Sequence, residues 1–376
     1  MVSSPLLIGV ECATMELLST IETKEEETEM KITTIGLDLA KSVFHVVCFD
    51  EQHQEVSKRM LRRTQVRAYF TQHEPCRVAM EACAGAHHWA RQLQQRGYAV
   101  KLIAPQFVKP YVKSNKNDAN DAEAICEAMS RPAMRFVAVK TVEQQDIQAA
   151  HRIRAGLIEQ LIAKANQIRG LASEYGLVAP KELVHLRRAI AHWLEDADNG
   201  LSARFRRLLH GLRQDLAALG GRVSELDREI ASIARADPLA QRLQQLRGVG
   251  PMIATALVAT VGDVRQFANG RQLAASLGLT PKQNSSGGKA RLLGISKRGD
   301  AYLRCLLVHG ARAMIRTART KEDPLSRWVM RIATQRHPNI AAVALANKTV
   351  RIAWAMMRNG CDYQPRLALA QHASPS

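Results

Sequence analysis

The sequence has no apolar run of the roughly 18 to 20 residues that a membrane-spanning helix needs, which argues against a membrane protein. No basic stretch precedes an apolar one at the N-terminus, so no secretory signal is predicted. The seven cysteines are odd in number, scattered, and never spaced as Cys-x-x-Cys. This pattern supports neither a zinc site nor a disulfide framework, and it favours reduced thiols in a cytoplasm.

Acidic residues are scarce as well. The 376 residues include 53 Lys and Arg against 35 Asp and Glu, and the sequence pI is near 10.0. Seven glutamates and one lysine lie in residues 1–30, so the rest of the chain carries a formal charge of +24. A charge of this size favours nucleic acid as the partner. The acidic stretch is interpreted as a flexible leader or as an artefact of an upstream start codon, without a function.

The remaining composition, 46% hydrophobic and 23% charged, is that of a globular protein with room for two or three domains. Apolar alternation predicts strands at 32–39, 43–50, 77–81 and 99–104, with a helix at 87–95 between the last two. Strands followed by alternating helix and strand are typical of an α/β domain. The predicted organisation is a leader at 1–30, this domain at 31–138, a helical segment at 139–238, a mainly helical domain at 239–362 and a tail at 363–376.

The helical segment contains one proline, Pro180, between residues 142 and 234, and its apolar residues recur at helical spacing. A helical hairpin or coiled-coil insertion is predicted, with turns near 175–177 and at 196–200. It is either a plain spacer or an arm for oligomerisation or for holding nucleic acid. Residues 241–320 then carry 13 Lys and Arg against two Asp, a concentration of charge that indicates phosphate binding.

Four carboxylates stand out against this basic background. Asp38 lies in the first strand and Glu81 ends a later strand, so both can reach the same edge of one sheet. Asp118 and Asp121 are three residues apart at a predicted helix start, which places them on one face. Carboxylate oxygens converging in this way suit Mg²⁺, and a pair of ions can hold both oxygens of a phosphodiester in transfer. Alternatively, Asp118 is an N-cap and Asp121 a favourable first-turn charge.

A serine loop follows in the basic region. Ser285 and Ser286 precede two glycines, and cations surround them at Lys289, Arg291, Lys297, Arg298 and Arg304. The loop is not a Walker A motif, because Gln283 and Ala290 break the pattern. A serine here is either a phosphate-binding hydroxyl or a nucleophile whose developing charge the cations stabilise. No neighbouring histidine offers itself as a base.

Upstream, the glycines of the turn Gly248-Val249-Gly250-Pro251 resemble those of a helix-hairpin-helix element. Such glycines expose backbone N–H groups at a helix N-terminus, and Pro251 suits the first helical position. The turn would grip a nucleic-acid backbone without reading sequence. A plain tight turn has the same pattern.

Taken together, these motifs resemble the DEDD-type insertion-sequence transposases of the group named one-ten and its eleven-eleven relatives. The resemblance covers about residues 31–360, and the ordered combination of motifs is more specific than any one of them. Its motifs are GLDLAK at 36–41, MEA at 80–82, KNDANDA at 116–122, SSGGK at 285–289, KRG at 297–299 and VALANK at 343–348.

The resemblance implies an RNase H-like (RuvC-like) domain whose four acids, here Asp38, Glu81, Asp118 and Asp121, bind Mg²⁺. It also implies a coiled-coil segment and a C-terminal transposase domain with a catalytic serine, here Ser286, with Ser285 as the rival. Members act on DNA as recombinases guided by a bridge RNA from their own element. We therefore expect a cytoplasmic, nucleoid-associated transposase, working as a dimer or tetramer, that cuts and rejoins DNA through a phosphoserine.

Two other functions fit the same residues. A junction-resolving nuclease would use the acids to activate water and the serine only to hold a phosphate. A non-catalytic nucleic-acid-binding protein would use charge alone.

Overall fold

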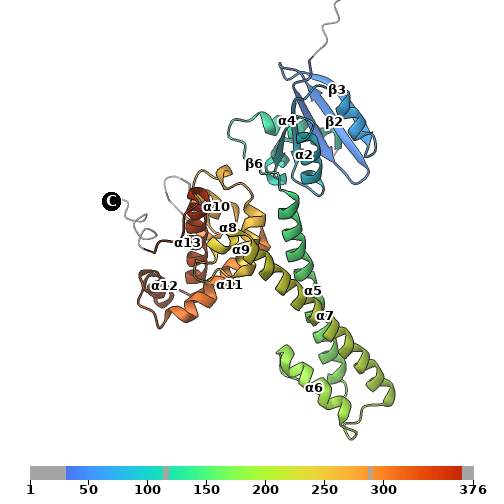
Figure 1. Cartoon of the computed structure of the whole chain (residues 1–376), viewed down its shortest axis with the longest axis vertical. Helices are drawn as coiled ribbons and strands as arrows, with labels where there is room; N and C mark the ends of the chain where they lie inside the picture. The colour runs from blue at the N-terminus through green and yellow to red at the C-terminus, as the bar shows by residue number, and fades with distance from the viewer. Residues whose placement is uncertain (1–30, 113–117, 287–288, 290, 366–376) are drawn as a thin grey trace, which may run out of the picture.

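The computed structural model describes residues 31–112, 118–286, 289 and 291–365, without the side chains of residues 118 and 119. Figure 1 shows a sheet with its helices at one end of the molecule, a long helical arm leading away from it, and a compact group of helices beside the first part of the arm. The prediction of a mixed fold, α/β followed by mainly helical structure, is confirmed by a six-stranded sheet followed by long helices.

The sheet has the strand order β3-β2-β1-β4-β5-β6. β1 pairs antiparallel with β2 and parallel with β4, while β5 is parallel to β4 and antiparallel to β6. This arrangement is consistent with the RNase H-like domain that the resemblance implies. The strands are β1 (Thr34–Leu39), β2 (Val43–Phe49), β3 (Glu55–Arg62), β4 (Arg77–Glu81), β5 (Ala99–Ile103) and β6 (Phe136–Val137).

Helices cover both faces of the sheet. α1 (Val66–Thr71) and α2 (Ala86–Gln94) bury Phe70 and Trp89 against one face. There the rings of Trp89 and Phe44 pack edge to face, with their centroids 5.3 Å apart. α3 (Pro105–Val108), a 3-10 turn (Lys109–Tyr111) and α4 (Asp118–Ser130) cover the other face. The fully buried Ile125 anchors α4 there. A sheet buried on both faces gives its strand ends fixed positions.

The arm consists of α5 (Val142–Ser173), α6 (Leu183–Glu195) and α7 (Ala203–Ala236), and the long helices α5 and α7 lie side by side (Figure 1). α5 begins with a capping box in which Thr141 and Gln144 satisfy each other's backbone N–H groups. The chain turns between α5 and α6 and between α6 and α7, at the two places predicted. The end of the arm has a core of its own around Ile168, Leu186 and Leu209.

The C-terminal unit is helical apart from one small hairpin. Its core forms around α9, whose Ala254 and Leu257 are fully buried. Its elements are α8 (Pro238–Leu243), α9 (Pro251–Val261), a 3-10 turn (Val264–Gln266), α10 (Gly270–Ser276), β7 (Pro281–Gln283), β8 (Leu292–Ile295), α11 (Ala301–Ala318), α12 (Pro324–Gln335) and α13 (Pro338–Asn359).

Among the described residues, α13 alone has the length and apolar composition of a membrane-spanning helix. Its Ala342, Ala346 and Val350 are fully buried in the core of the C-terminal unit, together with residues of α9 and α11. A core helix passes the same test of length and composition. This burial accounts for its apolar face.

All six cysteines that the structure describes are free thiols. Cys48 and Cys126 are buried, whereas Cys305 and Cys361 are exposed. No disulfide therefore links the described elements.

Candidate active site

Two of the predicted acids lie at or next to the ends of neighbouring strands. In the parallel pair β1 and β4, Leu37 lies opposite Met80, so the next residues, Asp38 and Glu81, follow at the same edge. Both carboxylates are half-buried. The strand register thus brings together two residues that are far apart in the sequence.

α4 brings Asp121 to the same edge. The helix crosses β1 at Gly36, where an added Cβ would lie 2.3 Å from the carbonyl oxygen of Ala122 and 2.6 Å from Cys126 Sγ. Only a residue without a side chain allows the helix backbone to come this close. Asp121, one residue before Ala122, is therefore held beside the ends of β1 and β4.

The three carboxylates are close enough to influence one another's ionisation. The pKa of Glu81 is raised, first by burial and then by the negative charges of Asp38 and Asp121, while Lys109 opposes the shift. Burial and the charges of Glu81 and Asp38 raise the pKa of the neighbouring Cys83 thiol as well. Negative groups that disfavour each other's ionisation lose this penalty when a cation lies between them.

Among the described side chains, no group of three or more His, Cys, Asp and Glu residues has the geometry to hold a metal ion. Asp118 begins α4, and its side chain lies outside the described part of the structure. The four predicted acids offer only carboxylate oxygens as ligands, which suits Mg²⁺ rather than zinc. Asp38, Glu81 and Asp121 are the described residues that would hold it.

The predicted serine loop lies between β7 and β8, and its two serines differ in their surroundings. The hydroxyl of Ser285 accepts hydrogen bonds from Gln283 Nε2 at 3.0 Å and from the backbone N–H of Arg291 at 3.3 Å. Ser286 is exposed, and its backbone pairs with Lys289. Its hydroxyl makes no hydrogen bond with any residue that the structure describes, and Gly287, Gly288 and Ala290 are outside the described residues.

The segment after β8 is fixed to α10. Gly278, with φ of +70°, lets the backbone of Arg298 approach so closely that an added Cβ would lie 2.4 Å from its N and O atoms. Arg304 Nη1 donates to the carbonyls of Leu277 and Arg298 at 3.0 and 2.7 Å. Arg304 therefore braces the loop, whereas Lys297 and the Arg298 side chain are exposed beside it.

The predicted glycine turn precedes α9. Gly248 has φ of +83°, and an added Cβ would lie 2.7 Å from the carbonyl oxygen of Gly310 in α11. The missing side chain of Gly248 allows its backbone to pack closely against the backbone of Gly310. Gly250 is the exposed N-cap of α9, with Pro251 at the first helical position and open space around it. Of the two glycines, Gly250 has the environment that a phosphate-binding turn needs.

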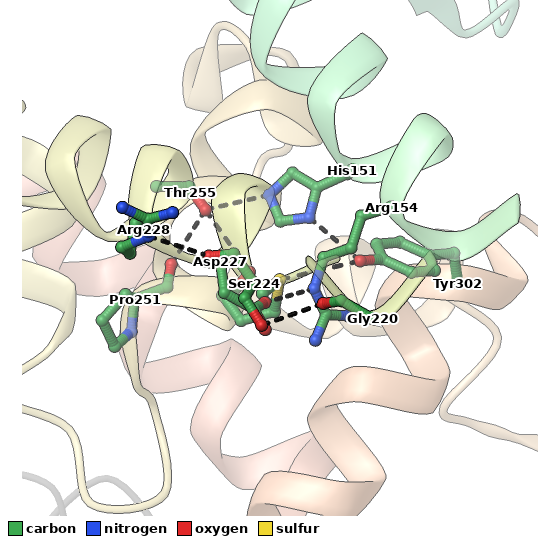
Figure 2. A network of polar contacts seen from close by, with 10 residues as sticks. His151, Arg154, Gly220, Ser224, Asp227, Arg228, Pro251, Thr255 and Tyr302 are labelled. Carbon is green, nitrogen blue, oxygen red and sulfur yellow. Dashed lines mark hydrogen bonds and ion pairs between the residues drawn. The ribbon is translucent and has the colours of Figure 1, made fainter. Parts of the chain in front are cut away.

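A buried polar network that the sequence analysis missed joins the arm to this turn (Figure 2). His151 in α5 is 3% exposed and bonds Thr255 Oγ1 at 2.9 Å and the hydroxyl of Tyr302 at 3.0 Å. The Thr255 hydroxyl donates to the carbonyl of Pro251, so His151 Nε2 carries its hydrogen and Nδ1 accepts from Tyr302. Burial, with the charge of Arg154 added, lowers the pKa of His151 to about 4, so the imidazole is neutral.

Within one chain, the acids and the serine loop belong to different units. Asp38, Glu81 and Asp121 lie on the sheet and α4, and Ser286 follows β7. Among the described residues, β7 and β8 contact each other and make no extended contact with β1, β4 or α4. The acids and the serine loop thus lie on elements without extended contact in the described part of the chain.

Two family models match the chain. A DEDD model of the IS110 type, described as "Transposase", matches residues 35–176, and a model described as "Transposase IS116/IS110/IS902 family" matches residues 240–324. The first match covers β1, β4 and α4, and the second covers the glycine turn and the serine loop.

Several curated proteins are similar over most of the chain. A probable family 20 transposase of Pseudomonas aeruginosa is 49% identical over 89% of this chain and 100% of its own length. The transposase for insertion sequence element IS1111A of Coxiella burnetii is 44% identical over 91% of this chain and 94% of its own length. The transposase for insertion sequence element IS1328 of Yersinia enterocolitica is 41% identical over 88% of this chain and 98% of its own length.

Proposed function

This chain belongs to the IS116/IS110/IS902 family of transposases and is a DNA transposase, and we propose that it cuts and rejoins DNA through a phosphoserine intermediate formed on Ser286. The observation that carries the proposal is the convergence of Asp38, Glu81 and Asp121 at one sheet edge, together with an exposed serine in a cationic loop.

The acids act in this proposal as the holders of Mg²⁺. Asp38, Glu81 and Asp121 are the ligands that the described side chains offer, and Asp118 completes the set by motif. Bound there, Mg²⁺ would neutralise charge on the scissile phosphate and help to place it. Gly36 keeps α4 at the distance from β1 that the set requires.

Ser286 supplies the nucleophile. Its Oγ forms an ester bond to phosphorus while the bond from phosphorus to the leaving strand oxygen breaks. The serine loses its proton, and the leaving oxygen gains one. Rejoining reverses these steps with a new strand end, so the bond energy is conserved without ATP. The hydroxyl of Ser285 is occupied within the loop, which favours Ser286 over its neighbour.

The cations around the loop hold the nucleic-acid backbone. Lys289, Arg291, Lys297 and the Arg298 side chain are exposed, as contacts to phosphates require. The exposed N-cap Gly250 acts with them in the manner of a helix-hairpin-helix turn. An element-encoded RNA pairs with the DNA and chooses the site, so that the protein recognises backbone and shape.

The active form is a homo-oligomer, a dimer or tetramer, in which the acids of one subunit meet the serine of another. The lack of extended contact between the serine loop and the acid-bearing elements among the described residues supports this arrangement. The α5–α7 arm serves as a coiled-coil connector between subunits. The protein works in the cytoplasm, on the DNA of the nucleoid.

The test is strand cleavage of a plasmid that carries the reading frame with its native flanks, supplied with RNA transcribed from those flanks. Asp38→Asn should abolish cleavage and retain DNA binding, whereas Asp50→Asn, at the end of β2 in the same sheet, should cleave normally. Ser286→Ala should also abolish cleavage. Cleavage that persists in Ser286→Ala indicates a junction-resolving nuclease instead, and cleavage that persists in Asp38→Asn contradicts metal-dependent chemistry at this site.

A further inference from the structure

A cavity of about 650 Å³ lies between the sheet unit and the C-terminal unit, and none of the three acids lines it. One side is formed by α3, β6 and the residues after β6, and the other by the end of α9, α10, β7 and residues 296–299. Its volume falls within the roughly 300 to 1,000 Å³ of ligand-binding cavities. Ser286 does not line it either, and of the cations proposed to hold the nucleic-acid backbone Arg298 alone does, so the strand chemistry gives the cavity no role of its own.

The charge of the cavity is of one sign. Arg135, Lys140, Lys282 and Arg298 line it, and no Asp or Glu does. None of these cations forms an ion pair with a carboxylate that the structure describes. Asp300 is near enough to influence Lys140, but burial and Arg152 outweigh it and lower the pKa of that amine. Four cations that form no ion pair with a described carboxylate favour an anionic ligand.

Aromatic rings and amides line the same space. Phe107 and Phe136 come from the sheet unit, and Phe267, whose carbonyl accepts from Trp354 Nε1, comes from the C-terminal unit. Gln106, Gln272 and Gln283 add side-chain amides. Gln272 Oε1 and Gln283 Nε2 are bonded locally, but Gln272 Nε2, Gln283 Oε1 and both amide atoms of Gln106 have no partner among the described residues. Phe107 and Phe136 also pack partly against the core of the sheet unit, and Lys101 Nζ lies 5.3 Å from the Phe136 ring centroid, so the cavity offers part of their ring surface beside free donors and acceptors.

One hydrogen bond joins the two walls directly, and further bonds fix the wall of the C-terminal unit. Gln266 accepts from the backbone N–H of Ala138 through Oε1 and donates to the carbonyl of Val261 through Nε2. Arg304 and Gly278 hold the backbone of Arg298, as described above. A ligand would meet a preformed site, which lowers the ordering cost of binding.

We propose that this cavity binds one unpaired nucleotide of a nucleic-acid strand, with the base against the phenylalanines and amides and its phosphates against the four cations. Cationic and aromatic groups combine in this way where proteins bind single strands. The inference rests on the proposed function only in taking a nucleic acid as the partner. It adds a base-holding site that spans the two units.

The experiment is equilibrium binding of labelled dodecamers to the full chain in EDTA, where strand cleavage cannot contribute. The probes are oligo(U) RNA, oligo(dT) DNA, a fully abasic strand of equal charge, and free UMP as competitor. The wild-type protein should bind a base-containing strand at least about fivefold more tightly than the abasic strand. The RNA and DNA arms identify which strand supplies the nucleotide.

Variants localise that preference. Phe107→Leu should abolish it, and Tyr175→Leu, at the far end of the arm, should retain it. Lys282→Ala should weaken binding of all strands alike, whereas Lys58→Ala, on the opposite sheet edge, should have little effect. A wild-type protein that binds abasic and base-containing strands equally, a Phe107→Leu variant that keeps the preference, or competition by UMP without base-dependent strand binding would each overturn the proposal.

Photocrosslinking of the wild-type protein to 4-thiouridine RNA or 4-thiothymidine DNA covers the case in which Phe107→Leu does not fold. Crosslinks in residues 104–107, 135–140, 260–262, 266–283 or 296–299 are expected, and crosslinks confined to other segments contradict the site. Because neither measurement uses cleavage, the base-holding site and the phosphoserine reaction can fail independently.

Discussion

Gly36→Ala should damage the proposed metal site without touching any of its acids. The added Cβ would lie 2.3 Å from the Ala122 carbonyl oxygen, whereas ordinary contact begins at 3.4 Å, so α4 must move by about 1 Å. The obstructing atom belongs to the helix backbone, so a rotamer change cannot relieve it. Asp121 moves with the helix, away from Asp38 and Glu81.

Two magnitudes follow from this displacement. Overpacking of this kind costs about 1 to 3 kcal/mol of the free energy of unfolding. A misplacement of about 1 Å in a catalytic arrangement lowers the rate by about 100-fold. We therefore expect the loss of cleavage to exceed what the loss of stability explains, because a folded fraction above 90% remains after a cost of this size in a protein of ordinary stability.

The assay compares strand cleavage over a series of Mg²⁺ concentrations with urea unfolding of the same preparations. Gly36→Ala should cleave about 100-fold more slowly and need more Mg²⁺. Gly170→Ala, in α5 with open space around the added Cβ, should gain about 0.5 to 1 kcal/mol and cleave normally. Wild-type cleavage and Mg²⁺ dependence in Gly36→Ala would refute the reasoning.

Three further predictions concern other parts of the chain. The pKa of His151 is about 4 in the folded protein and 6.5 in the unfolded chain, so the neutral imidazole contributes about 3 kcal/mol to the free energy of unfolding above pH 6.5, and this contribution is lost as the pH falls toward 4. The free energy of unfolding in urea should therefore depend less on pH in His151→Gln than in the wild-type protein between pH 6.5 and 4. An equal pH dependence would contradict the assignment. Arg304→Met should lower the free energy of unfolding by about 1 to 3 kcal/mol, because it leaves the carbonyls of Leu277 and Arg298 without their donor; unchanged stability in thermal and urea unfolding would show that the brace is unimportant. Lys348 is 5% exposed, forms no ion pair with a described carboxylate, and its Nζ lies 4.9 Å from the ring centroid of Trp328. Lys348→Met should therefore raise the free energy of unfolding by about 1 kcal/mol at pH 7, and this gain should shrink at high pH, because the wild-type amine, whose pKa is lowered, becomes neutral there. A less stable variant would mean that the cation stabilises the fold.

The position of Asp38 and Glu81 at one sheet edge was predictable because both residues have local signals. Asp38 and Glu81 each interrupt or end an apolar strand, and the ends of neighbouring parallel strands lie at one edge. The strands that sequence reasoning missed lack such a signal. β3 has a single buried residue, Leu61, and is held by backbone pairing with β2, while β6 is two residues long.

The roles of the basic residues were harder to predict, because partners distant in sequence decide them. Arg304 is of a residue type that often contacts phosphates, but its Nη1 donates hydrogen bonds to carbonyls that are brought near it only in the folded chain. His151 meets Thr255 and Tyr302 across 104 and 151 residues of sequence. The nucleotide cavity likewise needs walls from two units, which no local pattern reveals.

The most direct test of the central claim is the mass of the protein after reaction with the flanked plasmid, denaturation and nuclease digestion. We predict a nucleotide phosphate on the peptide that contains Ser286, present in Ser285→Ala and absent from both Ser286→Ala and Asp38→Asn. Cut DNA without any protein-linked phosphate, or a phosphate on a residue other than Ser286, would contradict the account.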